Sequence, residues 1–324
     1  MVRQARLDAP GTLHHVIIRG IEKGRIVDDQ RDRENFVSRM REIASDTKTA
    51  IYGWSLMTNH AHILLRSGPL GLSKFMRRLL TGYAITYNLR HSRYGHVFQN
   101  RYKSIVCDED SYFRELLRYI HLNPLRAKLV KNISELNRYP WCGHAVLMGR
   151  IKHEWQDRDY VLSWFGKKEG EAKRAYGKYV EEGIPLGKRP DLVGGGLIRS
   201  LGGWSAVMSL RSHKQQVFTD ERILGAGDFV EKVFKEADKR LKYQLTAKER
   251  RQEMQKKIEE ICEKEGINIE ELRMGSRRGS IPRVRADISY QLINELGIPS
   301  AEIARQLGVS TSAITKILQK RMIE

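Results

Sequence analysis

The sequence predicts an α+β protein: a ferredoxin-like split βαβ antiparallel sheet with helices, followed by an all-α C-terminal helix-turn-helix domain. Three observations support this fold class. The hydrophobic pattern of residues 1–125 changes in the order strand, helix, strand, strand, helix, strand. Two histidines one residue apart lie inside one of the apolar strands, and the end of the chain carries apolar residues at helical spacing around a glycine.

Each element of the first domain is predicted from the spacing of its apolar residues. Short β-branched runs bounded by glycine predict strands, whereas apolar residues three and four apart predict helices. Only Thr58 and Asn59 separate the second strand from the third, which predicts a tight hairpin. Pro124 predicts the end of the last helix. The expected strands are residues 13–18, 50–57, 60–66 and 103–107, and the expected helices are residues 31–45, 72–90 and 110–123.

The pattern weakens beyond residue 150. Residues 160–180 predict a helix, and residues 183–203 predict a connection, because their glycine run lacks the Gly-Lys-Ser/Thr ending of a phosphate-binding loop. The expected domains are 1–150, a mostly helical connecting region of unknown role at 151–244, and a helical domain at 245–324.

Residues 300–319 predict a helix-turn-helix. Ala304 allows two helices to approach, Gly308 permits the turn between them, and Ile314 and Ile317 anchor the second helix. Short polar or basic side chains on that helix could reach base edges or phosphates, which favours a DNA-binding unit over a small helical packing module. These candidate DNA contacts are Ser310, Thr311, Ser312, Thr315 and Lys316.

The net charge of +19, from 58 Lys and Arg against 39 Asp and Glu, indicates a polyanionic partner. Nucleic acid is the first candidate, and an ordinary basic soluble protein is the alternative. Three widely spaced cysteines indicate neither a disulfide framework nor a cysteine-ligated zinc site. Without a long apolar run or a secretion signal, we expect a soluble cytoplasmic protein with no membrane partner.

His60 and His62 are the most informative residues of the chain. Side chains at positions i and i+2 of a strand point to the same side of a sheet, so both imidazoles converge. The flanking apolar residues indicate a buried strand, and a neutral imidazole is a common metal ligand. The pattern predicts a metal site with open coordination positions, although such a pair taken alone is more often structural.

A third ligand and a nucleophile are expected nearby, and the helix before Pro124 offers both. Tyr119 and Asn123 are four residues apart and share a helix face. The asparagine can give a carbonyl oxygen to a metal, and a tyrosine hydroxyl can attack phosphorus to form a covalent intermediate. The structural alternatives are a core aromatic at Tyr119 and a helix cap at Asn123.

These motifs together resemble the single-tyrosine HUH transposases, most closely the REP-associated tyrosine transposases. The His60-Ala61-His62 triplet resembles the His-hydrophobic-His motif of that family, and residues 119–124 resemble its nucleophile helix. Residues 13–20 resemble its first strand, and residues 95–103 its basic segment before the last strand. The resemblance covers about residues 5–145, and several motifs stand in the family's order.

The resemblance implies an activity. Tyr119 would attack a single-stranded DNA phosphodiester, giving a 5′-phosphotyrosine and a free 3′-hydroxyl, with Mg²⁺ or Mn²⁺ held by His60, His62 and Asn123. In the insertion-sequence relatives a glutamine takes the place of Asn123, whose side chain reaches one methylene less far. The family also implies recognition of DNA hairpins and frequent dimerisation. The C-terminal segment resembles the helix-turn-helix domain of bacterial replication initiators.

Four basic residues of the first domain are further candidates for DNA contact. Arg77 and Arg78 lie on the predicted helix 72–90, where a solvated face is the alternative. Arg101 and Lys103 belong to the matched basic segment. Two rival functions are a non-catalytic DNA-binding regulator on the same fold and a zinc hydrolase of small substrates.

Overall fold

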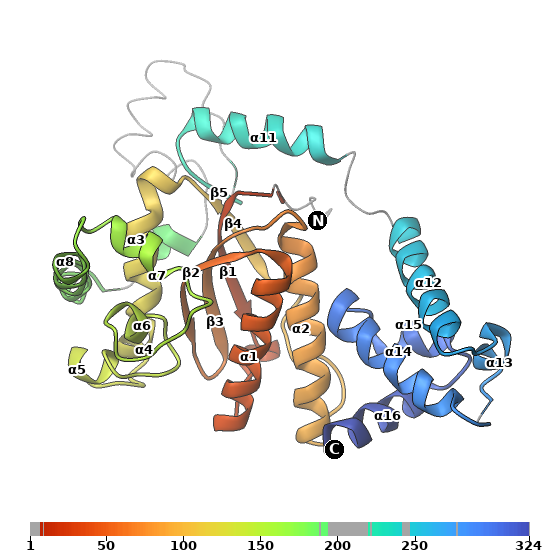
Figure 1. Cartoon of the computed structure of the whole chain (residues 1–324). Coiled ribbons are helices and arrows are strands. Elements are labelled where there is room, and N and C mark those ends of the chain that lie inside the picture. The colour runs from red at the N-terminus through yellow and green to blue at the C-terminus, as the bar shows by residue number, and fades with distance from the viewer. Residues whose placement is uncertain are drawn as a thin grey trace. The chain divides into compact units, whose positions relative to one another are not determined.

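The computed structural model describes residues 7–8, 10–187, 189–193, 220, 222–241, 247–276 and 278–323. The chain divides into two compact units, which are described separately (Figure 1). The sheet unit comprises Met1–Ser73 and Val97–Leu241, and the helical unit comprises Lys74–His96 and Lys242–Glu324. No described helix combines the length and apolar character needed to span a bilayer.

The sheet unit is built on five strands in the order β2-β3-β1-β4-β5. The first four pair antiparallel, in the order that a split βαβ arrangement requires, and β5 adds in parallel to the edge strand β4. The α+β class is therefore confirmed, whereas β5 was not expected. The strands are β1 (Leu13–Arg19), β2 (Ala50–Leu56), β3 (His60–Arg66), β4 (Lys103–Cys107) and β5 (Ile223–Leu224).

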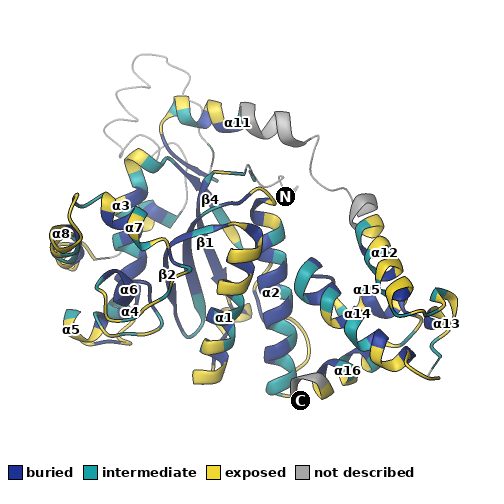
Figure 2. Ribbon diagram, viewed as in Figure 1, coloured by how far each residue is buried: buried dark blue, intermediate teal, exposed yellow. Residues whose placement is uncertain are grey.

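One face of the sheet is covered by α3 (Glu109–His121), α7 (Arg158–Ser163) and α8 (Glu169–Glu181). Gly53 on β2 permits the close approach of α3, because a Cβ there would lie 2.8 Å from Leu117 Cδ1. Side chains of α7 and α8 share a hydrophobic core with α3, so this core is continuous across residue 150. Figure 2 shows that most strand residues are buried.

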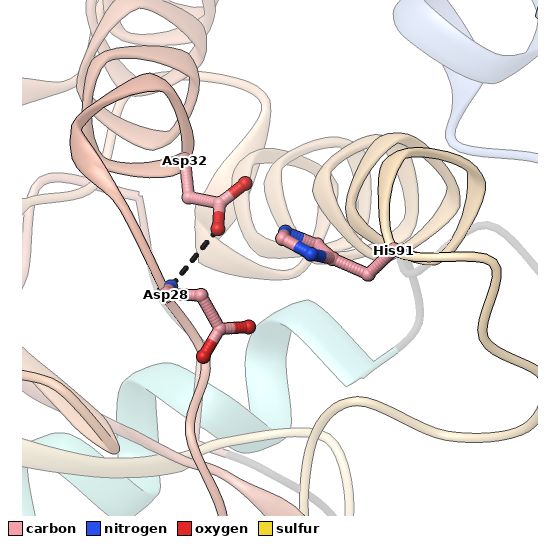
Figure 3. A group of neighbouring side chains, drawn as sticks. All are labelled: Asp28, Asp32 and His91. Carbon is pink, nitrogen blue, oxygen red and sulfur yellow. Dashed lines mark hydrogen bonds between the residues drawn. The ribbon is translucent and has the colours of Figure 1, made fainter.

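The long helix α1 (Gln30–Thr47) lies on the other face of the sheet (Figure 1). It begins at Asp29, whose side chain accepts a hydrogen bond from the backbone N–H of Asp32 at 2.9 Å. The carboxylate of Asp32 in turn accepts from the backbone N–H of Asp28 at 2.9 Å (Figure 3). His91, also drawn in Figure 3, belongs to the helical unit.

Two expectations about helix ends are wrong. Pro124 does not end the helix that carries Tyr119; α3 ends at His121, and Pro124 lies in the first turn of α4 (Asn123–Arg126). Proline is tolerated there because the N–H it lacks would have no partner within the helix. The single helix expected at 160–180 is two helices, and Asp157 caps the first by accepting from the backbone N–H of Tyr160.

The remaining described elements complete the sheet unit. They are η1 (Ile21–Lys23), α5 (Ile133–Leu136), α6 (His144–Leu147), η2 (Pro190–Val193) and α11 (Gly227–Leu241). The expected connection at 183–203 includes η2, and its residues 194–203 lie outside the described residues.

The helical unit contains residues 74–90 of α2 (Gly71–Arg90) and five C-terminal helices. Ile85 and Leu89 of α2 pack against the apolar core of those helices. Gly308 takes a φ of +64° between the last two helices, and a Cβ there would collide with the Arg273 carbonyl, so glycine is required. The C-terminal helices are α12 (Ala247–Lys264), α13 (Ile269–Arg273), α14 (Ile281–Leu296), α15 (Ser300–Gln306) and α16 (Thr311–Ile323).

Candidate active site

The two histidines of β3 lie side by side, as their spacing on the strand predicts. The ring centroids of His60 and His62 are 5.3 Å apart with an interplanar angle of 82°. His62 is buried, and His60 is half-buried. Both rings project from the sheet face that α3 covers, because residues 60, 62 and 64 alternate to one side of the strand and Leu64 packs in the core that includes α3.

Tyr119 of α3 lies against this pair. Its ring centroid is 5.6 Å from that of His62, with an edge-to-face angle of 84°. Leu116 and Ile120 on the same helix are fully buried in the core and fix the rotation of α3, while Tyr119 itself is half-buried. The structure therefore brings Tyr119 against His62, which in turn lies beside His60, within one chain.

A third histidine, His15 of β1, completes the cluster and was not predicted. The register pairs Ile17 with His62, which places His15 diagonally from His62 on the same face. His15 Nε2 and His62 Nδ1 are 2.9 Å apart, and the His15 ring lies 5.9 Å from that of Tyr119. Sequence spacing could not reveal this contact because it depends on strand register.

Neighbouring groups indicate the tautomer of His60. The Asn59 side-chain nitrogen donates to the carbonyl oxygen of Lys23 at 3.1 Å, which turns the Asn59 carbonyl oxygen toward His60. His60 Nδ1 therefore donates to that oxygen, 2.6 Å away. A neutral imidazole with a proton on Nδ1 carries its lone pair on Nε2, the state in which that nitrogen binds a metal.

Burial keeps the three imidazoles neutral. It lowers the pKa of His15 and of His60 to about 4 in each case. Burial also lowers the pKa of His62 well below its usual value, and the neighbouring His15, His60 and Arg19 lower it further. Neutral imidazoles are the metal-binding form, so the cluster suits a cation at neutral pH.

Two arginines border the phenol of Tyr119. Arg19 is exposed at the end of β1, in register with His60, and its charge acts on His60, His62 and Tyr119. The guanidinium carbon of Arg126 lies 5.5 Å from the Tyr119 ring centroid. Burial raises the pKa of Tyr119, and the charges of Arg126 and Arg19 partly oppose that rise. Sequence reasoning missed both arginines.

Asn123 follows Tyr119 by four residues and is buried at the start of α4. Its side-chain nitrogen has no hydrogen-bond partner among the residues that the structure describes. The atom without a partner is a hydrogen-bond donor, whereas a metal would bind the amide oxygen, so this observation does not bear on the predicted metal ligation.

The residues present fit a divalent cation. His60 offers an Nε2 lone pair, and His62 lies beside it as a neutral imidazole. Each histidine makes a hydrogen bond through Nδ1, the second contact that metal-binding histidines usually have. His60 and His62 would hold the ion, and Asn123 as a third ligand stays a prediction.

The four basic residues predicted to contact DNA occupy different environments. Arg101 is exposed next to β4. Lys103 Nζ donates to the backbone carbonyl of Val193 at 2.6 Å. In the helical unit, Arg77 is half-buried, whereas Arg78 is 7 % exposed and its Nε donates to the carbonyl oxygen of Asn294. The guanidinium of Arg78 therefore makes a hydrogen bond within the helical unit.

The polar residues predicted for the helix-turn-helix lie at the start of α16. Ser310, Thr311, Ser312 and Lys316 are exposed, and Thr315 is half-buried with its hydroxyl donating to the carbonyl of Thr311 at 3.0 Å. The Ser310 hydroxyl accepts from the backbone N–H of Ala313 at 3.1 Å and so caps the helix.

Comparison with known proteins gives two findings. Residues 11–123, about a third of the chain, match the family model described as "Transposase IS200 like". Among solved structures, the chain is similar to a REP-associated tyrosine transposase bound to a REP hairpin. That match has 13% identity and a TM-score of 0.39, and it covers 49% of this chain and 98% of the other. No curated protein matches the sequence.

Proposed function

We propose that this protein is a metal-dependent single-stranded DNA endonuclease and strand transferase that acts at hairpin DNA. The observation that carries the proposal is the cluster of His60, His62 and Tyr119 in one chain. All three residues lie within the segment that matches a transposase family model, and this match supports a function in DNA processing. The net charge of +19 agrees with a DNA partner.

The proposed reaction is a phosphoryl transfer to tyrosine. The Tyr119 oxygen forms a bond to phosphorus while the bond from phosphorus to the 3′-oxygen breaks, which leaves a 5′-phosphotyrosine and a free 3′-hydroxyl. The phenolic proton ends on the departing 3′-oxygen, and the reverse step rejoins the strand. A bound Mg²⁺ or Mn²⁺ would supply polarisation of the phosphoryl oxygens.

The arginines have defined tasks in this reaction. Burial raises the pKa of Tyr119, so its hydroxyl is protonated at neutral pH and must lose that proton during attack. The positive charges of Arg126 and Arg19 stabilise the negative charge that develops on the phenolic oxygen. Arg19 is exposed beside His60 and would also bind the scissile phosphate.

His60, His62 and Tyr119 of the proposed centre lie together in one chain. The contact between the rings of His62 and Tyr119 supports a centre formed within one chain, and the homodimer expected from the family stays a prediction. We further propose that α15 and α16 form a helix-turn-helix whose exposed polar residues bind duplex DNA. We also propose that the protein acts on DNA in the cytoplasm.

The decisive experiment uses labelled hairpin oligonucleotides taken from repeats beside the gene, with Mn²⁺ in the reaction. We expect cleavage and a labelled protein band that survives denaturing electrophoresis. Tyr119→Phe should abolish the band while leaving oligonucleotide binding intact. Tyr112→Phe is a matched control because Tyr112 is another half-buried tyrosine on the same helix, and it should retain the band.

Two results would contradict the proposal. A labelled band that persists in Tyr119→Phe would remove the proposed nucleophile. Cleavage with no protein–DNA linkage would favour the metal-hydrolase alternative, in which water is the attacking group. DNA binding that does not weaken as salt rises would contradict the expected contacts with phosphate.

A further inference from the structure

We propose that His15 is a positioning residue that fixes the tautomer of His62, and that the backbone carbonyl of Leu192 fixes His15 in turn. We call this series of hydrogen bonds, from Leu192 through His15 to His62, the relay. Its purpose, which is to direct the Nε2 lone pair of His62 toward the metal, rests on the proposed function. The relay gives a role to η2, which lies outside the segment 11–123 that matches the family model.

The relay begins at Leu192. His15 Nδ1 is 3.1 Å from the Leu192 carbonyl oxygen, and a carbonyl oxygen only accepts hydrogen bonds. His15 Nδ1 must therefore carry a proton. Since this imidazole is fully buried and neutral, its Nε2 carries a lone pair.

The relay continues to His62. The lone pair on His15 Nε2 faces His62 Nδ1 at 2.9 Å, so His62 Nδ1 donates and carries the proton of that neutral ring. The second lone pair is left on His62 Nε2, which has no hydrogen-bond partner among the described residues. In the other tautomer a proton would occupy Nε2 and block a metal, and the two lone pairs on His15 and His62 would face each other.

Three contacts hold η2 in the position that the relay needs. The Leu192 side chain is 1% exposed and belongs to the core beneath α3. Arg189, next to η2, forms ion pairs with Glu115 of α3 at 2.9 Å and with Asp191 at 2.6 Å. Lys103 of β4 donates to the adjacent carbonyl of Val193. The carbonyl of Leu192 is therefore a fixed acceptor.

His14 provides a matched control within the same strand. It is as fully buried as His15, but it points to the opposite face of the sheet, where its Nδ1 lies 3.0 Å from the hydroxyl of Ser104. A substitution at His14 therefore reproduces the loss of a buried imidazole from β1 without touching His62.

The first test reads the tautomer directly by ¹⁵N NMR of the metal-free wild-type protein at pH 7. The signals of His15 and His62 are assigned from their loss in His15→Gln and His62→Ala. We expect both rings to carry the proton on Nδ1 and the lone pair on Nε2. A proton on Nε2 of His62 would overturn the relay.

The second test measures Mn²⁺ affinity by electron paramagnetic resonance without DNA. His15→Leu should weaken Mn²⁺ binding by about 10- to 100-fold, the usual effect of losing such a supporting contact. His15→Gln should recover most of the affinity, because its amide oxygen can accept from His62 Nδ1, and His14→Leu should stay within about twofold of the wild type. Equal losses in His14→Leu and His15→Leu would contradict a positioning role.

The outcomes separate this inference from the proposed function. If the expected tautomer and the His15→Leu loss are found but no covalent adduct forms, the relay stands and the nuclease proposal fails. If the adduct forms while His62 carries its proton on Nε2, the nuclease proposal stands and the relay is wrong.

Discussion

The sheet unit contains two histidine clusters on the same face of the sheet, and only one of them is the proposed active site. The first joins His15, His60 and His62 beside Tyr119. In the second, the Tyr176 hydroxyl lies 2.8 Å from His121 Nδ1 and 2.6 Å from His144 Nδ1, and His144 Nε2 donates to the side-chain oxygen of Asn137 at 2.7 Å.

The polar atoms of the second cluster mostly form hydrogen bonds with one another or with Asn137. Donation to Asn137 leaves the lone pair of His144 on Nδ1, which accepts from the Tyr176 hydroxyl, and that oxygen accepts from His121. His121 Nε2 keeps a lone pair without a partner among the described residues. Gly53 and Gly143 lie close to this nitrogen, because a Cβ at either position would be 3.1 Å from it.

The comparison teaches which features distinguish a site from a core network. Burial lowers the pKa of histidines in both clusters, so a lowered pKa does not identify the proposed site. The first cluster differs because His60 and Tyr119 are only half-buried and the exposed Arg19 borders them. Solvent access and a nearby positive charge therefore distinguish the proposed site from the second cluster.

Removing one histidine from each cluster should give the largest contrast. His62→Ala should lower the rate of adduct formation by about 1,000-fold, because metal polarisation is worth several kcal/mol of transition-state stabilisation. His144→Ala should leave Mn²⁺ binding unchanged and lower the free energy of unfolding. Single-turnover assays and Mn²⁺ titrations check both, and equal loss of Mn²⁺ binding in the two variants would break the comparison.

Lowering the pH should lower the free energy of unfolding of the protein, because both clusters contain histidines that stay neutral when folded. The pKa of His15 is about 4 and that of His144 about 3 in the folded protein, against 6.5 for an ordinary histidine. Between these values the unfolded chain binds more protons, so the unfolding free energy falls as pH drops below about 7, by up to about 1.4 kcal/mol per pH unit for each histidine.

Adding Mn²⁺ during the same pH series should affect only the first cluster. Because the pKa of His60 is about 4, the first cluster stays neutral at pH 5.5, and Mn²⁺ should raise the melting temperature there as it does at pH 7. Denaturation followed by circular dichroism measures both effects. Unfolding stability that is flat between pH 7 and pH 5 would contradict the assignment of buried neutral imidazoles.

Removing the charge that borders the first cluster should have an intermediate effect. Arg19→Ala should slow adduct formation by about 10- to 100-fold, because one charge-assisted contact to phosphate is worth about 1.5–3 kcal/mol. Arg41→Ala is the control, since Arg41 is an arginine with 57% of its side chain exposed on α1, away from this face. Equal rates in the two variants would remove Arg19 from the site.

The smallest expected effect concerns the hydroxyl at the centre of the second cluster. Tyr176→Phe leaves His121 and His144 without their shared partner and should lower the unfolding free energy by about 1–3 kcal/mol. Urea denaturation measures this loss. Mn²⁺ affinity should not change, and a change would show that the second cluster also shapes the metal site.

The sequence was informative where periodicity decides structure. Strands 60–66 and 103–107 coincide with β3 and β4, because short apolar runs bounded by turn residues allow few alternatives. The same spacing predicted that His60 and His62 share a side of the sheet, which their 5.3 Å ring separation confirms.

The sequence could not reveal contacts set by register or by distant segments. The hydrogen bond between His15 and His62 spans 47 residues, and that between His15 and Leu192 spans 177. No spacing rule connects such positions. Arg19 was missed for the same reason, because its place beside His60 follows from the pairing of β1 with β3. The start of α4 at Asn123 was missed because Pro124, which we expected to end a helix, instead lies in the first turn of a new one.

The most direct test of the central claim is to locate the DNA linkage by mass spectrometry. Trypsin releases residues 119–126 as one peptide, which contains Tyr119 as its only tyrosine. After reaction with a hairpin oligonucleotide and nuclease digestion, we expect this peptide to carry a nucleotide through its 5′-phosphate. Linkage at any other residue, or cleavage that leaves this peptide unmodified, would contradict the account.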